Sequence, residues 1–247
     1  MPAHSTPGQE KVAYRFQRVY AGLQTGHSLT VQSKRNEPVS PFMQQSSLDS
    51  ACGVHVVAIL LIVFDLVKPS ALHDMARRKF GTAALVWKTF SHTYFSGVHA
   101  PEWVELVQSL ALPIQLTPKY GAEDNADGYA VDWLMRGDMV ALAFASVKHQ
   151  RTKHWSLAVG VEGLVIGKVH YPDTLLLLDP SASEPAFAAF NARLRLPLTN
   201  AGLRSAKTKL TKPNDTDKSK SAVWMYAAAE WHEEEVRLLA AVRCRRQ

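Results

Sequence analysis

Residues 51–64 read ACGVHVVAILLIVF, the most apolar stretch of the chain, and this stretch decides the fold that we expect. Apolar side chains occupy nearly every position rather than one face, which is typical of a helix that is buried on most sides. Asp49 and Ser50 precede the stretch as candidate N-cap residues, and Pro69 follows it. The sequence therefore predicts a core helix that begins near Cys52.

The composition of the chain is that of a globular protein, with 47% hydrophobic and 20% charged residues. A length of 247 residues suits one medium-sized domain with additional segments. The two cysteines, Cys52 and Cys244, lie far apart in the sequence and in unlike surroundings. A disulfide framework is therefore not expected, and a reducing compartment fits the cysteine usage better.

The sequence contains no recognisable targeting or membrane signal. Residues 1–22 lack the apolar core of a signal peptide. The longest apolar run, residues 56–64, is shorter than the roughly 20 residues that span a bilayer. We expect a cytoplasmic protein without a membrane span, and export by a route that needs no signal stays open.

Positive charge is concentrated in two segments of a chain whose net charge is +6. These segments are RSAKTKLTKPNDTDKSK (204–220) and VRCRRQ (242–247). Basic tails can bind nucleic acid or anionic surfaces. Here no aromatic residues are interleaved with the charges and no nucleic-acid motif is present. We therefore predict a solvated loop and tail, and no nucleic-acid partner.

Helical patterns in the first part of the chain give way to strand patterns in the second. Residues 70–81 (SALHDMARRKFG) and 101–112 (PEWVELVQSLAL) predict helices. Short aliphatic segments separated by turn signals predict strands: 139–146, 155–161, 164–170 and 174–179. This order favours an α+β fold in which an N-terminal helical part packs against an antiparallel β-sheet.

The sequence divides into four parts. Residues 1–40 are polar and punctuated by proline, and we interpret them as an N-terminal arm. Residues 41–200 form the central domain, and residues 201–221 a basic flexible loop. Residues 222–247 form a C-terminal extension of strand or helix, in which EEEVRLLAAVRCRR looks helical.

Cys52 has the surroundings that a nucleophilic thiol needs. The thiolate is the reactive form, and a free cysteine titrates near 8.5, so an active thiol needs positive potential nearby. A helix N-terminus supplies such potential. Gly53 would leave room for a substrate to approach the backbone. The other interpretation of Cys52 is a small buried hydrophobic residue.

His154 and Asp179 are the candidate partners of the thiol. His154 lies at the entry of a predicted strand behind a polar, basic loop, and Asp179 ends the strand LLLLD. If the strands 155–161 and 174–179 pair antiparallel, the start of one lies beside the end of the other. Asp179 could then fix the imidazole tautomer, as an aspartate does in serine triads. The alternatives are a surface histidine and a turn-forming Asp-Pro.

Other histidines are open as alternative bases. His149 lies within the polar loop, and His170 lies at the opposite end of the proposed hairpin. His55 follows Cys52 by three positions and could share its helix face, although a core histidine is the more ordinary interpretation.

Gln45 is the candidate for the second hydrogen-bond donor to an oxyanion. The backbone N–H of Cys52 can donate one bond, and an amide side chain is the usual second donor. Gln45 lies seven residues before Cys52 and could fold back over the same pocket, and Gln44 is the alternative. A solvent-exposed loop residue is the other interpretation.

The sequence predicts neither a metal site nor a cofactor. No Cys-x-x-Cys or His-Glu-x-x-His motif occurs. His232 in the segment WHEEEV stands beside carboxylates, as is ordinary for surface charge on a helix.

Taken together, Gln45, Cys52-Gly53, His154-Trp155 and Asp179-Pro180 resemble the signature of papain-like cysteine peptidases. The resemblance is closest to the bacterial branch that includes the bacteriocin-processing peptidase domains of ABC exporters. It spans residues 44 to about 185. Gln45 lies one residue further from the cysteine than is usual in the family. No transmembrane or nucleotide-binding segment accompanies the match, so a leader-peptide substrate is not carried over.

The resemblance implies a soluble cysteine peptidase of papain-like α+β fold that acts on a peptide or protein through a thioester. It implies Cys52 as nucleophile, His154 as general base and acid, Asp179 as orienter and Gln45 as oxyanion donor. The same residues also serve deamidation, transglutamination and acyl transfer, as in a toxin or effector, because the acyl-enzyme does not dictate which nucleophile releases it. A binding module that kept the fold without turnover is the alternative from another class.

Overall fold

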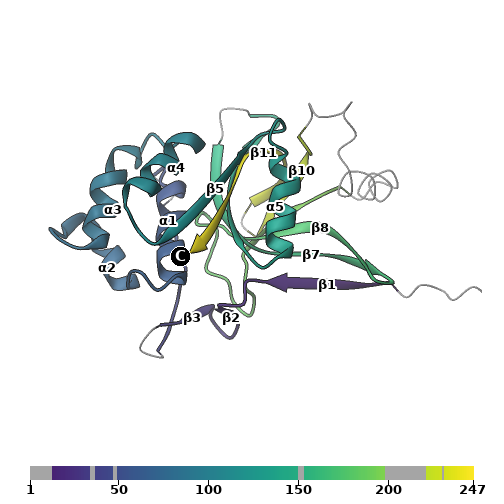
Figure 1. Cartoon of the computed structure of the whole chain (residues 1–247), viewed down its shortest axis with the longest axis horizontal. Helices are drawn as coiled ribbons and strands as arrows, with labels where there is room; N and C mark the ends of the chain where they lie inside the picture. Colours follow the sequence, from purple (N-terminus) through teal and green to yellow (C-terminus); the bar gives the residue numbers. More distant parts are fainter. Residues whose placement is uncertain (1–12, 34–36, 47–48, 150–152, 198–220, 230) are drawn as a thin grey trace, which may run out of the picture.

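The computed structural model describes residues 13–33, 37–46, 49–149, 153–197, 221–229 and 231–247, and all statements below concern these residues. The fold is mixed α+β, as the sequence predicts, with helices packed against a barrel-like sheet (Figure 1). The predicted basic loop lies outside the described residues except for Ser221.

Six antiparallel strands form a closed ring in the described part of the chain. They pair in the order β7-β6-β11-β10-β9-β8, and β8 pairs with β7 to close the ring. The bounds are β6 Met139–Ser146, β7 Lys153–Ile166, β8 Val169–Leu178, β9 Ala192–Arg195, β10 Trp224–Ala228 and β11 Trp231–Arg246. Closure removes most unpaired strand edges from the sheet.

Two further strands extend the ring, and three short strands form a separate sheet. β1 (Ala13–Val19) pairs with β7, and β5 (Ile114–Tyr120) pairs with β11. The small sheet contains β2 (Leu23–Gln24), β3 (Thr30–Gln32) and β4 (Pro38–Val39). Part of the predicted N-terminal arm is thus an edge strand of the main sheet.

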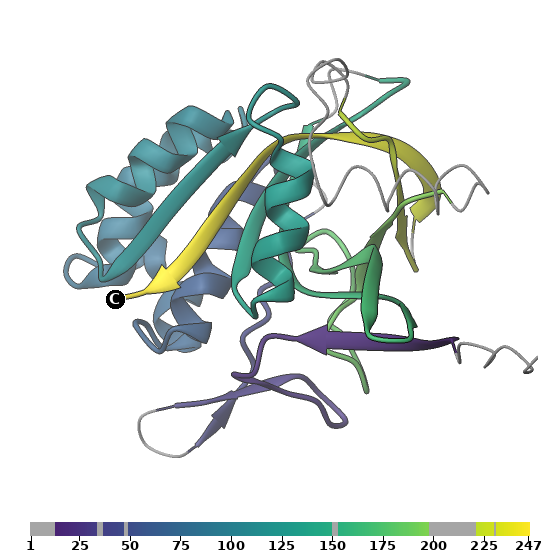
Figure 2. The ribbon, with the colours of Figure 1, turned by 45° about the vertical axis from the view of Figure 1, so that its right-hand side comes forward.

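The helices of the described residues lie on both sides of the sheet. On one side are α1 (Cys52–Val63), α2 (Pro69–His73), α3 (Thr82–Phe90) and α4 (Ala100–Ser109), with 3₁₀ turns at Met75–Arg77 and Ser91–Thr93. α5 (Ala126–Met135) packs on the other side, against β6, β7 and β11 (Figure 2). None of the described helices is long and apolar enough to cross a membrane.

The sheet separates two hydrophobic cores, and β6 shows how. Successive side chains of a strand point to opposite faces. Met139, Ala141 and Ala143 belong to the core that contains α1, whereas Val140 and Leu142 belong to the core beneath α5. β6 is buried along its whole length for this reason, which explains its continuous apolar sequence.

The predicted core helix is confirmed. α1 begins at Cys52, ends at Val63 and is buried at every position from Cys52 to Ile62. It packs against β7, so the helix and the strand that carries His154 are neighbours. The predicted strand 139–146 is confirmed with its bounds unchanged, and α4 confirms the predicted helix at 101–112.

The helix predicted for residues 70–81 is shorter than expected. α2 ends at His73, and a 3₁₀ turn follows it. Gly81, the last residue of the predicted helix, instead precedes the first residue of α3 with a φ of 88°. This φ lies in the left-handed region that favours glycine, so the glycine marks the turn between the two helices.

The predicted strands at 155–161 and 164–170 belong to one hairpin of two long strands. β7 continues through Glu162-Gly163, where a bulge absorbs the sequence that looked like a turn. The chain reverses instead at Gly167, whose φ is 65°. Pro172 and Asp173, which also looked like a turn, lie within β8.

The helix expected in the C-terminal extension is wrong, because residues 231–246 form the strand β11. Val236, Leu238, Val242 and Cys244 are buried, whereas Arg237 and Leu239 between them are exposed. A bulge near Leu239 corrects the alternation so that both halves of the strand bury their apolar side chains. Figure 2 shows β11 curving from the ring toward β5. Burial between neighbouring strands has overridden a helical propensity from Glu, Leu, Ala and Arg.

Candidate active site

Cys52 is the first residue of α1, and the preceding loop fixes the start of the helix. The N-cap residue is Ala51, not the predicted Asp49 or Ser50. The Ala51 N–H donates to Asp49 Oδ1 at 3.0 Å, and the Ser50 N–H donates to the carbonyl oxygen of Tyr94 at 2.9 Å. The Cys52 side chain lies in the first turn, where unpaired backbone N–H groups create positive potential. Cys52 is 7% exposed.

Gly53 has a packing role rather than the expected role in substrate approach. A Cβ atom at this position would lie 2.6 Å from Val98 Cγ1 and 3.1 Å from Trp103 Cδ1. The Trp103 indole N–H also donates to the Gly53 carbonyl oxygen at 2.9 Å. The glycine therefore lets the first turn of α1 lie directly against α4, which holds Cys52 rigidly.

His154 is presented by the first part of β7, and the next residue anchors that part. Trp155 stacks on Trp103 with ring centroids 4.7 Å apart, and its indole N–H donates to the Val98 carbonyl oxygen at 3.0 Å. Because side chains alternate along a strand, His154 points to the other face. There its ring has an edge contact with Phe144, with 5.3 Å between centroids.

The structure brings His154 and Asp179 into direct contact, as the antiparallel pairing of their strands predicts. β7 and β8 pair with Leu157 opposite Leu178, so Asp179 follows beside the start of β7. His154 Nε2 lies 2.8 Å from Asp179 Oδ1 and 2.9 Å from Oδ2. Since a carboxylate only accepts, Nε2 carries the donated proton. Nδ1 is the remaining ring nitrogen.

The Cys52 side chain is close enough to the imidazole ring to affect its pKa. Burial by itself would lower the pKa of His154, but the Asp179 carboxylate opposes this effect, and the Cys52 side chain adds to that opposition. Together they raise the pKa of His154 to about 10. The imidazole is therefore protonated at neutral pH and lies near two groups that stabilise its charge.

Ser181 and Tyr226 surround the Asp179 carboxylate with further donors. Ser181 donates to Oδ1 from its hydroxyl at 2.6 Å and from its backbone N–H at 2.8 Å. The Tyr226 hydroxyl donates to Oδ2 at 2.9 Å. Burial would raise the pKa of Asp179, which is 0% exposed, but His154 and Ser181 hold it below its usual value. The carboxylate is thereby kept ionised and fixed in orientation.

Asn191 fixes the backbone of the same residue. Its side chain accepts the Asp179 N–H at 2.7 Å and donates to the Asp179 carbonyl oxygen at 2.9 Å. The roles of Asn191 and Tyr226 could not be recognised in the sequence, because the residue just before β9 and the strand β10 bring them to the site from outside the quoted motifs. Ser181 directly follows Asp179-Pro180, and this position could have indicated its role at the site.

The backbone of Gln45 is bonded to the segment that follows Asp179. The Gln45 N–H donates to the Pro180 carbonyl oxygen at 2.7 Å, which ties the loop before α1 to the turn after Asp179. Its side-chain Nε2 donates to the Asp49 carbonyl oxygen at 2.9 Å. One further N–H of this amide remains for a ligand, since Nε2 carries two hydrogens. Gln44, the alternative donor, is exposed.

The alternative histidines have other contacts. His55 is buried on α1, where its Nδ1–H donates to the Met43 carbonyl oxygen at 3.2 Å, and burial lowers its pKa. His149 is exposed. His170 pairs with Val165 near the far end of the β7–β8 hairpin and contacts the ring of Phe16. Of these histidines, only His154 contacts the Asp179 carboxylate.

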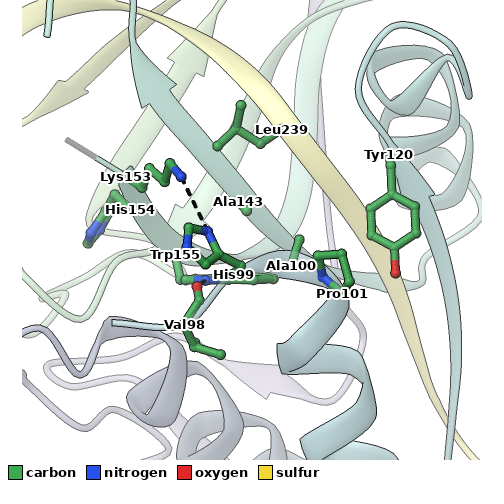
Figure 3. A pocket seen from close by; sticks show the side chains of 10 residues that line it. All are labelled: Val98, His99, Ala100, Pro101, Tyr120, Ala143, Lys153, His154, Trp155 and Leu239. Atoms are coloured by element: carbon green, nitrogen blue, oxygen red, sulfur yellow. Dashed lines mark hydrogen bonds between the residues drawn. The ribbon is translucent and has the colours of Figure 1, made fainter. Parts of the chain in front are cut away.

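Two cavities border His154, one on each side. The first, of about 290 Å³, is lined mainly by apolar side chains from the segment before α4, from β6 and from β11, together with His99 and Trp155 (Figure 3). The second, of about 490 Å³, is lined by the loop that carries Gln45 and by polar side chains of the ring strands. His154 and Lys153 line both. In the described part of the chain, no group of three or more His, Cys, Asp or Glu residues is arranged to hold a metal ion.

Comparison of the sequence with protein-family models returns no match, and comparison with curated proteins returns none either. The chemistry of the site therefore has to be inferred from its own geometry. A buried thiol at a helix N-terminus, a protonated imidazole and a fixed carboxylate form a chain of three groups that can stabilise a thiolate and transfer a proton.

Proposed function

We propose that the protein is a cysteine hydrolase of papain-like fold that cleaves a peptide bond through a thioester. One observation carries the proposal: the buried carboxylate of Asp179 holds the His154 ring at 2.8 Å, and the Cys52 side chain also raises the pKa of that ring. A surface histidine or a turn-forming aspartate would not need four donors around one carboxylate.

The residues have distinct roles in this mechanism. The Cys52 thiolate attacks the carbonyl carbon of the scissile bond, and the electron pair of the carbonyl moves to its oxygen. The imidazolium of His154 then gives its proton to the leaving amine, which leaves a thioester on Cys52. Water attacks the thioester while His154 accepts one of its protons, and the acid product leaves as the thiolate re-forms.

The remaining residues stabilise charge and orientation in the proposed mechanism. The Cys52 N–H in the first helical turn and the Gln45 amide donate to the oxyanion, and losing one such donor typically costs about 10²–10³ in rate. Asp179 keeps the imidazole in the tautomer that presents Nδ1 to the sulfur. The buried helix with its N-terminal cysteine, packed on an antiparallel sheet, supports the papain-like comparison.

A cut-site profile tests the proposal. A mixture of peptides is incubated with the wild-type protein and with Cys52→Ser, and the products are identified by mass spectrometry. We expect new peptide ends that appear only with the wild type. Added amines test for release of the acyl group by transfer, and a gain of one mass unit at glutamine tests for deamidation. A wild type that yields the same products as Cys52→Ser in all three measurements contradicts the proposal.

A further inference from the structure

The larger cavity beside His154 has an unbalanced charge. We name it the Glu234 cavity. Two carboxylates line it, Asp49 from the loop before α1 and Glu234 from β11. Phe144 and Val236 add apolar wall, and its volume of about 490 Å³ is in the range of ligand pockets.

Within the described residues, Lys153 is the one lysine or arginine that lines this cavity, and its charge points elsewhere. Its Nζ lies 3.2 Å from His99 Nδ1, a residue of the smaller cavity (Figure 3). The charge of His154 is already balanced by the Asp179 carboxylate at 2.8 Å. Neither cation therefore neutralises the two acidic groups.

The Asp49 carboxylate is held in place without a counter-charge. Its Oδ1 accepts the Ala51 N–H, whereas its buried Oδ2 has no hydrogen-bond partner among the described residues. The field of this charge reaches neighbouring groups: burial and Asp49 together raise the pKa of Tyr94. Asp49 is half-buried, and water screens the charge near its buried Oδ2 atom less than that of an exposed carboxylate, so it adds to the negative potential of the wall.

The side chain of Glu234 points in a different direction from the side chains of its acidic neighbours on β11. It pairs in register with Tyr226, is half-buried and lines the cavity, as does Val236. Glu233 forms an ion pair with Arg195 at 2.7 Å, and Glu235 is exposed on the opposite face of the strand. One of three consecutive glutamates thus points its charge at the space beside His154.

We propose that the Glu234 cavity binds a lysine or arginine side chain next to the scissile bond of the substrate. The inference rests on the proposed function, since it names the substrate class of the same site. The cation would meet Glu234 within a cavity whose potential Asp49 makes more negative. Its aliphatic stem would pack on Phe144 and Val236, as long basic side chains commonly do. An acidic residue at this position would be repelled.

The charge of the cavity is tested by the rate at which charged thiol reagents modify Cys52. A trimethylammonium-ethyl and a sulfonato-ethyl methanethiosulfonate are compared, and each rate is divided by the rate of the same reagent with free 2-mercaptoethanol. We expect the cationic reagent to be about three- to fivefold favoured in the wild type, the effect of one or two charges at moderate dielectric. Glu234→Gln should remove most of this preference, and raising the salt concentration should reduce it.

Glu235→Gln is the matched control, because it removes the same charge from the same strand on the opposite face. We expect it to leave the preference unchanged. If Cys52 reacts no faster than Cys244 in the wild type, the proposed function fails and this inference with it. If Cys52 reacts selectively but the reagent preference is equal in the wild type and both variants, only this inference is overturned.

The occupant itself is tested by the cut-site profile. We expect lysine or arginine to be enriched at one position that flanks the cut, and Glu234→Gln to reduce the enrichment by a similar three- to fivefold factor. A profile of selective, Cys52-dependent cuts without basic residues beside them overturns the choice of occupant and leaves the proposed hydrolase intact.

Discussion

The first turn of α1 and the C-terminal part of β11 each bury a cysteine, yet the two thiols have different surroundings. Cys244 is 2% exposed, its thiol donates to the Val242 carbonyl oxygen, and burial raises its pKa to about 12. Cys52 is almost as well buried, but it lies at a helix N-terminus and interacts with a protonated His154. Burial alone disfavours a thiolate, whereas a nearby cation favours it, and the proposed function therefore predicts that Cys52 is the more reactive of the two thiols.

Replacement of His154 should have the largest effect on this difference. In the wild type near neutral pH, we expect iodoacetamide to alkylate Cys52 rapidly and Cys244 hardly at all. In His154→Ala, the rate at Cys52 should fall by about 10² or more, because the cation that stabilises the thiolate is gone. Rates at each cysteine are read by mass spectrometry.

Cys244 serves as the internal control in that experiment. An unchanged slow rate at Cys244 shows that the sheet around β11 stays closed in the variant. Equal and slow alkylation of both cysteines in the wild type would contradict the expected difference in reactivity and would make Cys52 a structural thiol.

Replacement of Asp179 should have a smaller effect and a distinct pH signature. The wild-type imidazole has a pKa of about 10. In Asp179→Asn the carboxylate charge is lost, so the pKa of His154 should fall toward its ordinary value near 6.5. At pH 8 the imidazole would then be mostly neutral, and alkylation of Cys52 should slow by about 10- to 100-fold. NMR titration of His154 gives the pKa directly.

Asp173→Asn is the matched control, since this aspartate lies on the same strand β8 and pairs with Arg15 at 3.0 Å. It should leave the titration of His154 unchanged. An equal shift of the His154 pKa in both variants would assign the effect to general disturbance of the strand.

The raised pKa of His154 also makes stability depend on pH. A group whose pKa is higher in the folded state than in the unfolded state stabilises the fold fully below its unfolded pKa. For His154 this contribution is complete below about pH 6.5 and is lost as the pH rises through about 10. Urea unfolding should therefore show that the advantage of the wild type over His154→Gln shrinks across this range. A difference that stays constant from pH 6 to 10 would contradict the ion pair.

Removal of the Tyr226 hydroxyl should have a modest effect. Tyr226→Phe keeps the ring against Phe144 but removes one donor from Asp179 Oδ2. A hydrogen bond to a charged group contributes about 1.5–3 kcal/mol, so urea unfolding should show a loss of that size, and alkylation of Cys52 should slow by about tenfold. Tyr14→Phe, on the exposed edge strand, is the control and should change neither quantity.

Replacement of Cys244 should have the smallest effect on reactivity. Cys244→Ala removes a buried sulfur from β11 and should lower the free energy of unfolding by about 1–2 kcal/mol. The alkylation rate of Cys52 in the folded protein should not change. A large change would mean that β11 couples the two thiols, and the two regions could then no longer be treated as independent.

The sequence predicted the elements that depend on residues close together in the chain. A run that is apolar at nearly every position predicted the buried helix α1, and Cys52 lies at its start. The paired ends of two aliphatic strands predicted that His154 and Asp179 would meet, and they do. Errors in the turns did not affect this result, because the pairing of β7 with β8 depends on their ends near the site rather than on where the chain reverses.

Elements that depend on partners far away in the sequence could not be predicted in the same way. The segment that became β11 has helix-forming residues, and it is a strand because β6, β5 and β10 offer it partners on both sides. Strand preference depends on such neighbours more than on the residues themselves. Tyr226 and Glu234 reach the site only because this strand pairs with β10 in one register.

The sequence by itself determined that a thiol would begin a buried helix and that an imidazole and a carboxylate would end two adjacent strands. Periodicity and strand pairing are properties of short segments, so they can be read in order along the chain. The tertiary structure alone decided which donors surround Asp179 and which charges face the cavity beside His154. Those contacts depend on the closure of the ring of strands, where one shift of register would point each side chain to the opposite face.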